Sequence, residues 1–233
     1  MIVNTGEPAT GSGDVLWLRE EPPRPPRRST PLTLERIIDA AIAELDAHGA
    51  ERLTMRKLAE RLEVTSTALY WHVSTKRDLL DLALDHAVGE APLPAPDLDP
   101  RSGLRAVLLG WRAAMLAHPW LPGLLGRPLL GPNVLARTEF IQAMLVRSGL
   151  SGVDLAAATR LLANFVLGAA MADATWRQFD DPAVFARARA HILGLGERYP
   201  TLSTSGFADG EWSDDELFGL GLDRVLDQLL SAS

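Results

Sequence analysis

The sequence contains no cysteine, no long apolar run and no net positive charge, and each absence limits what the chain can do. Without cysteine, disulfide bonds, thiol catalysis and thiolate zinc sites are excluded. The histidines show none of the paired helical spacing of a zinc site; they are His48, His72, His86, His118 and His191. We therefore expect no metal and no cofactor.

No uninterrupted apolar run approaches the ~18 residues that a membrane span needs. The N-terminus lacks the basic-then-apolar pattern of a secretory signal. We therefore expect no membrane contact and a cytoplasmic location. With 47% hydrophobic and 23% charged residues, a chain of 233 residues can bury a sizeable core.

Signs of an enzyme are also missing. No serine lies in a nucleophile-elbow motif, and there is no glycine-rich phosphate loop. The pairs Asp180-Asp181 and Asp214-Asp215 each precede an expected helix, where capping and compensation of the helix dipole are the expected roles. Because active sites assemble in space, an enzyme or a small-molecule binding protein on a helical scaffold stays open as an alternative.

Positive charge is scarce overall, since the net charge is −7, but it is concentrated. Residues 24–78 hold ten Lys and Arg against eight Asp and Glu, a local excess of +2. Arg24, Arg27 and Arg28 lie in a Pro-rich segment, residues 1–30, which we expect to be disordered. These arginines could enter a DNA groove or only solubilise the chain, and both interpretations stay open.

The basic segment contains the most informative motif, LTMRKLAERLEVTSTALYWHVSTKRD, residues 53–78. Thr54 can cap a short helix with apolar residues at helical spacing, and Thr65 can cap a second one that ends near Trp71. This pattern predicts a helix-turn-helix, whose second helix fits the major groove of DNA.

The second helix carries short polar and aromatic side chains that suit contacts with base edges and phosphates. The residues that can face outward are Thr65, Ser66, Thr67, Tyr70 and His72. Half-buried packing of the aromatic residues in an ordinary helical bundle is the structural alternative.

Helical periodicity surrounds this motif. A first helix over about 33–48 is expected to end at Gly49, and Thr75 with Asp78 resembles a capping box that begins a fourth helix. Four prolines in residues 91–100 mark a boundary. We predict a disordered arm over residues 1–30, a helix-turn-helix domain over 31–90 and a second domain over 91–233.

The second domain is helical in period and contains no convincing strand. The expected helices cover about 100–117, 121–130, 132–148, 152–178, 182–198 and 213–231. The fold class is therefore all-α: an N-terminal three-helix unit is joined by a fourth helix to a C-terminal helical bundle.

The stretch from Leu34 to about Ala87 resembles the N-terminal domain of the TetR (tetracycline repressor) family of transcription regulators. The similarity lies in LERIIDAAIAELDAHGAE, LTMRKLAERLEV, ALYWHV and STKRDLL. A weaker similarity to the C-terminal domain of the tetracycline repressor runs from Trp111 to Trp176. The resemblance implies a homodimeric, ligand-responsive repressor that binds a palindromic DNA operator. An activator or a co-repressed regulator with the same DNA-binding head is the alternative.

The resemblance also implies roles for residues of the motif. Trp71 is expected to brace the domain rather than to read sequence. The base-reading positions are Ser66, Thr67 and Ala68, the phosphate-holding positions are Tyr70, His72 and Lys76, and Arg56 and Thr65 complete the expected DNA-contacting set.

In this family the long helix, here 152–178, and the last helix form a two-fold interface of four helices. Both are rich in small or apolar residues, and an intramolecular core would give the same pattern. One helix-turn-helix touches few bases and two-fold symmetry doubles the site, so we expect a homodimer.

A ligand pocket between helices of the bundle is expected as well. Aligned with the tetracycline repressor, the metal-holding histidine falls on Leu125, a nearby glutamate on Ala172 and another histidine near Pro92. We therefore expect an apolar or aromatic effector that binds without a metal. The candidate lining residues, most of which could equally be plain core, are Trp111, Met115, Leu125, Phe140, Met144, Asn164 and Phe165.

Overall fold

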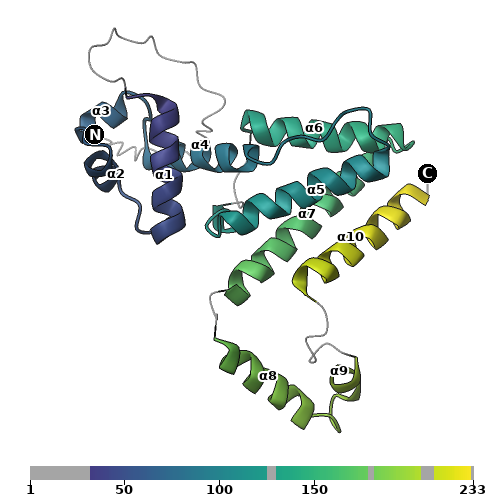
Figure 1. The fold of residues 1–233 in the computed structure, drawn as a ribbon. Helices are drawn as coiled ribbons and strands as arrows, with labels where there is room; N and C mark the ends of the chain where they lie inside the picture. The colour runs from purple at the N-terminus through teal and green to yellow at the C-terminus, as the bar shows by residue number, and fades with distance from the viewer. Residues whose placement is uncertain (1–31, 125–129, 178–180, 206–212, 232–233) are drawn as a thin grey trace, which may run out of the picture.

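The computed structural model describes residues 32–124, 130–177, 181–205 and 213–231. All secondary structure in these ranges is helical, which confirms the all-α fold class (Figure 1). The helices are α1 Leu34–His48, α2 Met55–Arg61, α3 Ser66–Tyr70, α4 Lys76–Gly89, α5 Pro100–Ala117, the 3-10 turn η2 Pro122–Leu124, α6 Pro132–Arg147, α7 Gly152–Arg177, α8 Pro182–Gly194, α9 Pro200–Thr204 and α10 Asp214–Ser231.

Local sequence explains where the helices of the N-terminal head begin and end. The hydroxyls of Thr54 and Thr65 each accept a hydrogen bond from the backbone N–H three residues later, at 3.2 Å, as predicted for N-caps. The predicted capping box is confirmed at the start of α4, where Thr75 and Asp78 exchange two bonds of 3.1 Å. Gly49 ends α1 with a φ of 76°, a backbone conformation that favours glycine.

The head and the bundle share one helix. α4 packs against α1 of the head and against α5 and α6 of the bundle (Figure 1). One hydrophobic core therefore runs from α1 through α4 into α5, α6, α7 and α10. A movement of α6 can therefore reach the head through α4.

Buried and half-buried arginines of α5 hold the bundle together. Arg112 is buried and pairs with Asp173 of α7 at 2.8 Å and with Asp215 of α10 at 2.6 Å. Asp215 lies in the first turn of α10, as expected, but its carboxylate pairs with Arg112 rather than capping the helix. The hydroxyl of Ser213 instead accepts from the N–H of Glu216 at 3.2 Å.

Two expected helices differ from the structure. The helix predicted over 121–130 contains only the short turn η2 in its described part, and residues 125–129 lie outside the described ranges. The helix predicted over 182–198 ends at Gly194 and is followed by α9, which the sequence analysis did not predict. Glycines at 194 and 196 explain the early end, because glycine is a poor helix former.

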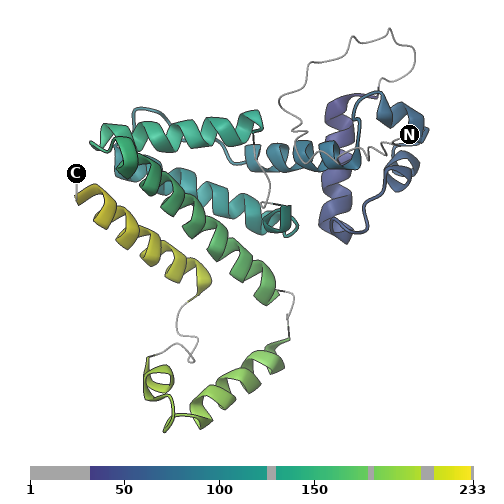
Figure 2. The ribbon, with the colours of Figure 1, turned by 180° about the vertical axis from the view of Figure 1, so that it is seen from behind.

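Helices α8 and α9 form an arm that extends away from the bundle in both views (Figures 1 and 2). No described side chain of residues 181–205 is buried, although several are large and apolar. The large apolar residues that are exposed in this arm are Val184, Phe185, Leu193, Tyr199 and Leu202.

Helix α7 is strongly apolar, although the single chain buries only a small part of it. Residues Gly152–Thr175 have a mean hydropathy of 1.5 and are long enough to cross a membrane by length and composition, yet only 22% of the apolar window is buried. The sequence shows no uninterrupted apolar run here because Asp154 and Arg160 interrupt it. Much of the apolar surface of α7 is therefore exposed in the single chain.

Candidate functional site

The helix-turn-helix consists of α2, a tight turn and α3, and it presents one face of α3 to solvent. Leu69 on the opposite face is fully buried. In the turn, Glu63 has a left-handed backbone with a φ of 55°, which is costly for any residue but glycine. The N–H of Val64 then donates to the carbonyl oxygen of Ala59 at 3.0 Å. These features fix the angle between α2 and α3.

The outward face of α3 carries the side chains that the sequence predicts for DNA contact. Thr67 and Tyr70 are exposed, and Ser66, Ala68 and His72 are half-buried. The short side chains lie in the first turn and the larger ones at the end of the helix. This order allows the N-terminal end of α3 to approach base edges closely.

Three neighbouring residues complete the surface. Thr65 is exposed, with its hydroxyl engaged in the cap. Arg56 on α2 is exposed, and its Nε lies 3.4 Å from Glu60 Oε1. The expectation that Trp71 braces the domain is wrong, because 74% of its side chain is exposed. Leu69 and Val73 fill the core on either side of it, so the indole turns outward.

Lys76 has a structural partner at the start of α4. Its Nζ donates to the carbonyl oxygen of Ala50 at 2.9 Å and ties α4 to the loop after α1. An ammonium group has three donors, so this bond leaves donors for a phosphate. Arg77, the next residue, is exposed. Both lysines of the chain, Lys57 and Lys76, lie in the helix-turn-helix segment.

A charged junction links the head to the end of α5. His118 is buried there; its Nδ1 lies 2.8 Å from Asp46 Oδ1 of α1, and its Nε2 lies 3.0 Å from Glu90 Oε2. Trp120 Nε1 donates to the same Asp46 oxygen at 2.6 Å. Burial alone lowers the pKa of His118, but the hydrogen bonds and charges of the two carboxylates outweigh it and raise the pKa.

This raised pKa predicts that the junction weakens at high pH. The stabilising contribution of His118 is fully present below the unfolded pKa of about 6.5 and is lost as the pH rises through the higher folded pKa. We expect the free energy of unfolding to fall as the pH rises above about 6.5, and to fall less in His118→Gln. Denaturant titrations of both proteins across this range test it, and parallel profiles would contradict it.

A second junction joins α4 to α6. Asp85 of α4 is buried and caps α6, accepting bonds from Asn133 N at 3.2 Å, Asn133 Nδ2 at 3.0 Å and Val134 N at 3.0 Å. The preceding residue, Gly131, provides no side-chain cap. It packs so closely on the Asp85 carboxylate that a Cβ atom would overlap it. The N-terminus of α6 is therefore held by α4.

Arg137 strengthens the same junction from α6. Its guanidinium is buried and donates to the carbonyl oxygen of Ala91, just after α4, and to that of Asn133 at 3.1 Å. Burial lowers the pKa of Arg137, and the nearby charge of Asp85 opposes this shift. Two buried groups of opposite charge thus connect α4 and α6.

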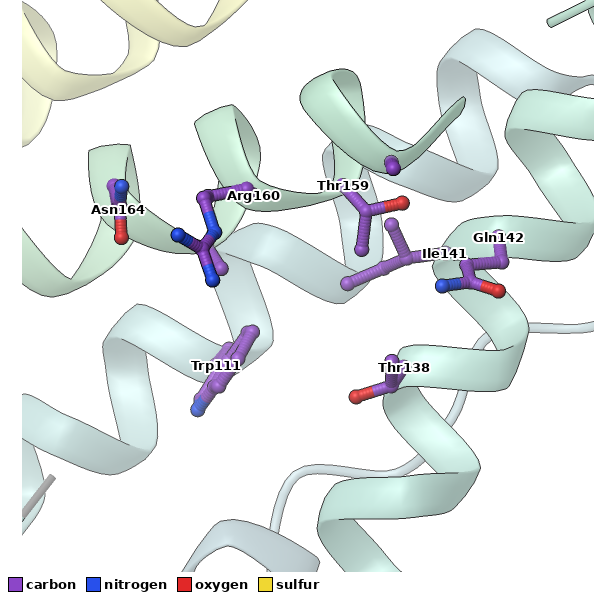
Figure 3. Close-up of a pocket in the computed structure, with 9 residues that line it drawn as sticks. Trp111, Thr138, Ile141, Gln142, Thr159, Arg160 and Asn164 are labelled. Atoms are coloured by element: carbon purple, nitrogen blue, oxygen red, sulfur yellow. The ribbon is translucent and has the colours of Figure 1, made fainter. Parts of the chain in front are cut away.

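A cavity of about 480 Å³ lies between α5, α6 and α7 (Figure 3). Ile141 and two alanines of α7 provide apolar lining. The polar lining consists of Trp111, Thr138, Gln142, Thr159, Arg160 and Asn164. The volume falls in the range of small-molecule sites.

The structure brings only some of the expected ligand-binding residues to this cavity. Trp111 and Asn164 line it. Met115, Phe140 and Met144 are buried in the core and are not among its lining residues, while Phe165 stacks on Phe218 at a centroid distance of 5.2 Å. Leu125 lies outside the described residues. The polar groups Gln142 and Arg160 were missed because nothing in the sequence separates them from solvent-facing helix residues.

Known proteins share this arrangement. Residues 37–83 match the family described as bacterial regulatory proteins, tetR family, and residues 93–231 match the tetracyclin repressor-like C-terminal domain. An HTH-type transcriptional regulator of Saccharopolyspora erythraea is 40% identical over 90% of this chain and 88% of that protein. The HTH-type transcriptional repressor DrrR1 of Streptomyces coeruleorubidus is 34% identical over 94% of this chain and 87% of that protein.

A solved structure agrees. The crystal structure of the Streptomyces coelicolor TetR family protein ActR in complex with (S)-DNPA matches with a TM-score of 0.77 and 28% identity, over 88% of this chain and 100% of that chain. A helix-turn-helix head on a helical bundle that encloses a cavity defines a DNA-binding transcription regulator. This chain belongs to the TetR family of bacterial regulatory proteins. The relatives named above are regulators of transcription.

Proposed function

We propose that this regulator is a homodimeric repressor that binds a palindromic operator in the cytoplasm and releases it when a small molecule occupies the cavity between α5, α6 and α7. The observation that carries this proposal is the path of contacts from the cavity through α6 and α4 to α1, and from α1 through α2 to the exposed helix α3.

The apolar faces of α7 and α10 support a dimer. Leu161 of α7 is 46% exposed, and Leu217 and Leu220 of α10 are 50% and 53% exposed. α7 and α10 pack against each other, so their exposed residues belong to neighbouring helices. Burying one such leucine contributes about 1.5–3 kcal/mol. A second copy offers the same faces by two-fold symmetry, which gives a four-helix interface.

The arm formed by α8 and α9 fits the same dimer. Its side chains gain little from packing within one chain, and apolar residues such as Phe185 and Leu193 are exposed. An arm that extends beyond its own bundle can bury this surface on the partner subunit.

The switch follows from the two junctions at α4. α6 provides Thr138, Ile141 and Gln142 to the cavity, and Asp85 of α4 caps its N-terminus. A ligand that displaces α6 therefore turns α4. In the DNA-bound dimer the two α3 helices are one helical turn of DNA apart, ~34–36 Å, and the turn of α4 changes this separation. Release requires that the ligand bind the DNA-free conformation more tightly.

Binding to duplex DNA from upstream of the protein's own gene tests the proposal. We expect saturable, sequence-preferring binding with two subunits per site, weakened about tenfold or more by Tyr70→Ala and by Arg77→Ala. Fluorescence anisotropy across a salt series measures both the affinity and the number of phosphate contacts.

Lys76→Ala needs a different readout, because Lys76 also bonds the carbonyl of Ala50. We expect this variant to lose both thermal stability and DNA affinity, whereas Arg77→Ala should lose only DNA affinity. Salt-sensitive binding without sequence preference, unchanged in all three variants, would show that the helix-turn-helix is structural only.

A further inference from the structure

A buried histidine connects the bundle to the head at two points. His118 directly follows the last residue of α5 and is 6% exposed, and this end of α5 lies next to α1 (Figures 1 and 2). Its Nδ1 lies 2.8 Å from Asp46 Oδ1 of α1, and its Nε2 lies 3.0 Å from Glu90 Oε2 at the end of α4. Both ring nitrogens therefore face a carboxylate oxygen, and the two carboxylates come from different helices.

Only the protonated ring can form both contacts. An ionised carboxylate accepts hydrogen bonds and donates none, so each ring nitrogen must carry a proton. Asp46 Oδ1 also accepts from Trp120 Nε1 at 2.6 Å, which fixes this oxygen as an acceptor. Burial lowers the pKa of His118, and the hydrogen bonds and charges of the two carboxylates outweigh burial and raise it. The two contacts together therefore require an imidazolium.

Loss of one proton affects the two contacts unequally. A neutral imidazole has one N–H and one lone pair, so one of the two carboxylates must face a lone pair. Asp46 keeps the Trp120 N–H as a second donor, whereas the side chain of Glu90 is 47% exposed and can turn into water. The neutral ring therefore keeps its N–H toward Asp46 and releases Glu90.

Glu90 lies at the end of the helix that ties the head to the bundle. α4 packs against α1, α5 and α6, and the contact of Glu90 with His118 attaches the end of α4 to α5. On the other side, Arg137 of α6 donates to the carbonyl oxygen of Ala91. When Glu90 is released, the end of α4 stays attached to α6 but loses its ion pair with α5.

We propose that His118 is a pH-sensitive latch: its protonated ring fixes α4 in the arrangement that binds the operator, and its deprotonation frees the end of α4 and weakens operator binding. A dimer binds two half-sites only when its heads lie at a fixed separation. Freedom at α4 lowers the fraction of dimers with this separation, and the apparent affinity falls with that fraction. The inference rests on the proposed function, because the latch acts on operator binding.

Operator affinity at about pH 6 and about pH 9 tests the latch on the full-length protein. Fluorescence anisotropy at constant salt measures it. We expect the unmodified protein to bind its operator at least about tenfold more weakly at the higher pH. His118→Gln should lose much less affinity between the two pH values, because glutamine does not titrate.

Other charged groups on the packed helices do not confuse this comparison. Asp46 and Glu90 are the partners of His118, and His118→Gln leaves every other group in place. These other groups are Asp39, Glu44 and His48 of α1, Asp81, Asp85 and His86 of α4, Arg112 of α5, Arg137 of α6, Asp173 of α7, and His72 on the DNA-binding face. The difference between the two pH profiles therefore belongs to His118.

Glu90→Gln separates the contact from its dependence on pH. An amide can accept from the protonated ring and donate to the neutral ring, so the contact forms in both states. We expect this variant to bind the operator at about pH 9 nearly as tightly as at about pH 6. Glu139→Gln removes the same charge from an exposed position of α6 and should keep the pH dependence of the unmodified protein.

Nitrogen-15 NMR of the His118 ring measures the latch directly, with His118→Gln to assign the signals. Below the titration midpoint both ring nitrogens should be protonated, and above it Nε2 should lose its proton first. Because coupling between binding events is reciprocal, addition of operator DNA should shift the midpoint to higher pH.

Two results would overturn the inference. One is equal pH profiles of operator affinity in the unmodified protein and His118→Gln. The other is a neutral ring that keeps its proton on Nε2, because Asp46 and not Glu90 would then be released. Absence of specific operator binding at both pH values would instead contradict the proposed function, and NMR of the free protein would still show whether the Glu90 contact opens.

Discussion

A protein that carries both Leu161→Glu and Leu220→Glu is expected to be monomeric and to bind its operator about 10²–10⁴-fold more weakly than the unmodified protein. The two leucines are exposed on α7 and α10 in the single chain, and the proposed interface buries them. Each substitution places a charge where a two-fold axis brings a second, identical charge. Sedimentation equilibrium measures the loss of the dimer, and fluorescence anisotropy measures the loss of affinity.

The large effect on DNA binding follows from the loss of the second head. When two heads are joined, the second binds its half-site as an intramolecular event, which multiplies the affinity without any new contact. A monomer retains α3 and every residue that contacts DNA, yet it binds only one half-site. The substitutions leave the head intact, so far-ultraviolet circular dichroism should be unchanged.

Leu135→Glu is the matched control for these substitutions. Leu135 is 48% exposed on α6, a helix outside the proposed interface of α7 and α10, so the same change of leucine to glutamate should leave a dimer with normal operator affinity. A double variant that stays dimeric would contradict the proposed interface. A monomeric double variant with normal affinity would contradict the claim that the operator needs two heads.

The features that the sequence predicts best are those with local causes. The caps at Thr54 and Thr65 and the capping box at Thr75 each involve residues within three positions of one another. The end of α1 at Gly49 depends on one backbone conformation. These local features fix the helices of the head, and helical periodicity then identifies the buried face of each.

The two junctions at α4 have no such local cause. Asp85 caps α6 across 48 positions of sequence, and His118 meets Asp46 across 72. No spacing rule indicates that a carboxylate inside α4 will serve as the N-cap of another helix. The sequence therefore predicts the helices, whereas the structure alone identifies how the head is coupled to the cavity.

Trp71 and Arg160 are two further residues whose surroundings cannot be predicted from the sequence. A tryptophan in a short amphipathic helix is expected to be buried, but Leu69 and Val73 already occupy the core beside it. An arginine within an alanine-rich helix is expected to face solvent, and Arg160 is exposed, but it also lines the cavity between α5, α6 and α7. In both cases the deciding factor is the shape of neighbouring helices.

Replacing Asp85 with alanine is expected to destabilise the protein by about 3 kcal/mol, because two backbone N–H groups at the start of α6 and the amide of Asn133 lose their acceptor. Arg137 loses its nearby negative charge at the same time. Denaturant titration measures the loss. Asp97→Ala removes an exposed carboxylate from the loop after α4 and should change the stability by less than about 0.5 kcal/mol.

The milder variant Asp85→Asn separates stability from switching. Asparagine keeps the size of the side chain and one acceptor oxygen, but it loses the charge and half of the cap. We expect it to bind a compound that occupies the cavity as tightly as the unmodified protein does, since Asp85 is not among the residues that line the cavity. The fall in operator affinity that the compound causes should be smaller, because α6 no longer pulls on α4 as firmly.

The test of Asp85→Asn requires that the affinity for the compound and the affinity for the operator be measured in the same variant. The coupling free energy is −RT times the logarithm of the ratio of operator affinities with and without the compound. The same ratio must appear in the affinity for the compound with and without operator. If Asp85→Asn keeps the full ratio, α6 does not act on the head through this junction. The contact of His118 with Asp46 and Glu90 would then be the remaining route, and the ratio measured in His118→Gln would decide whether the bundle controls α3 through α1 instead.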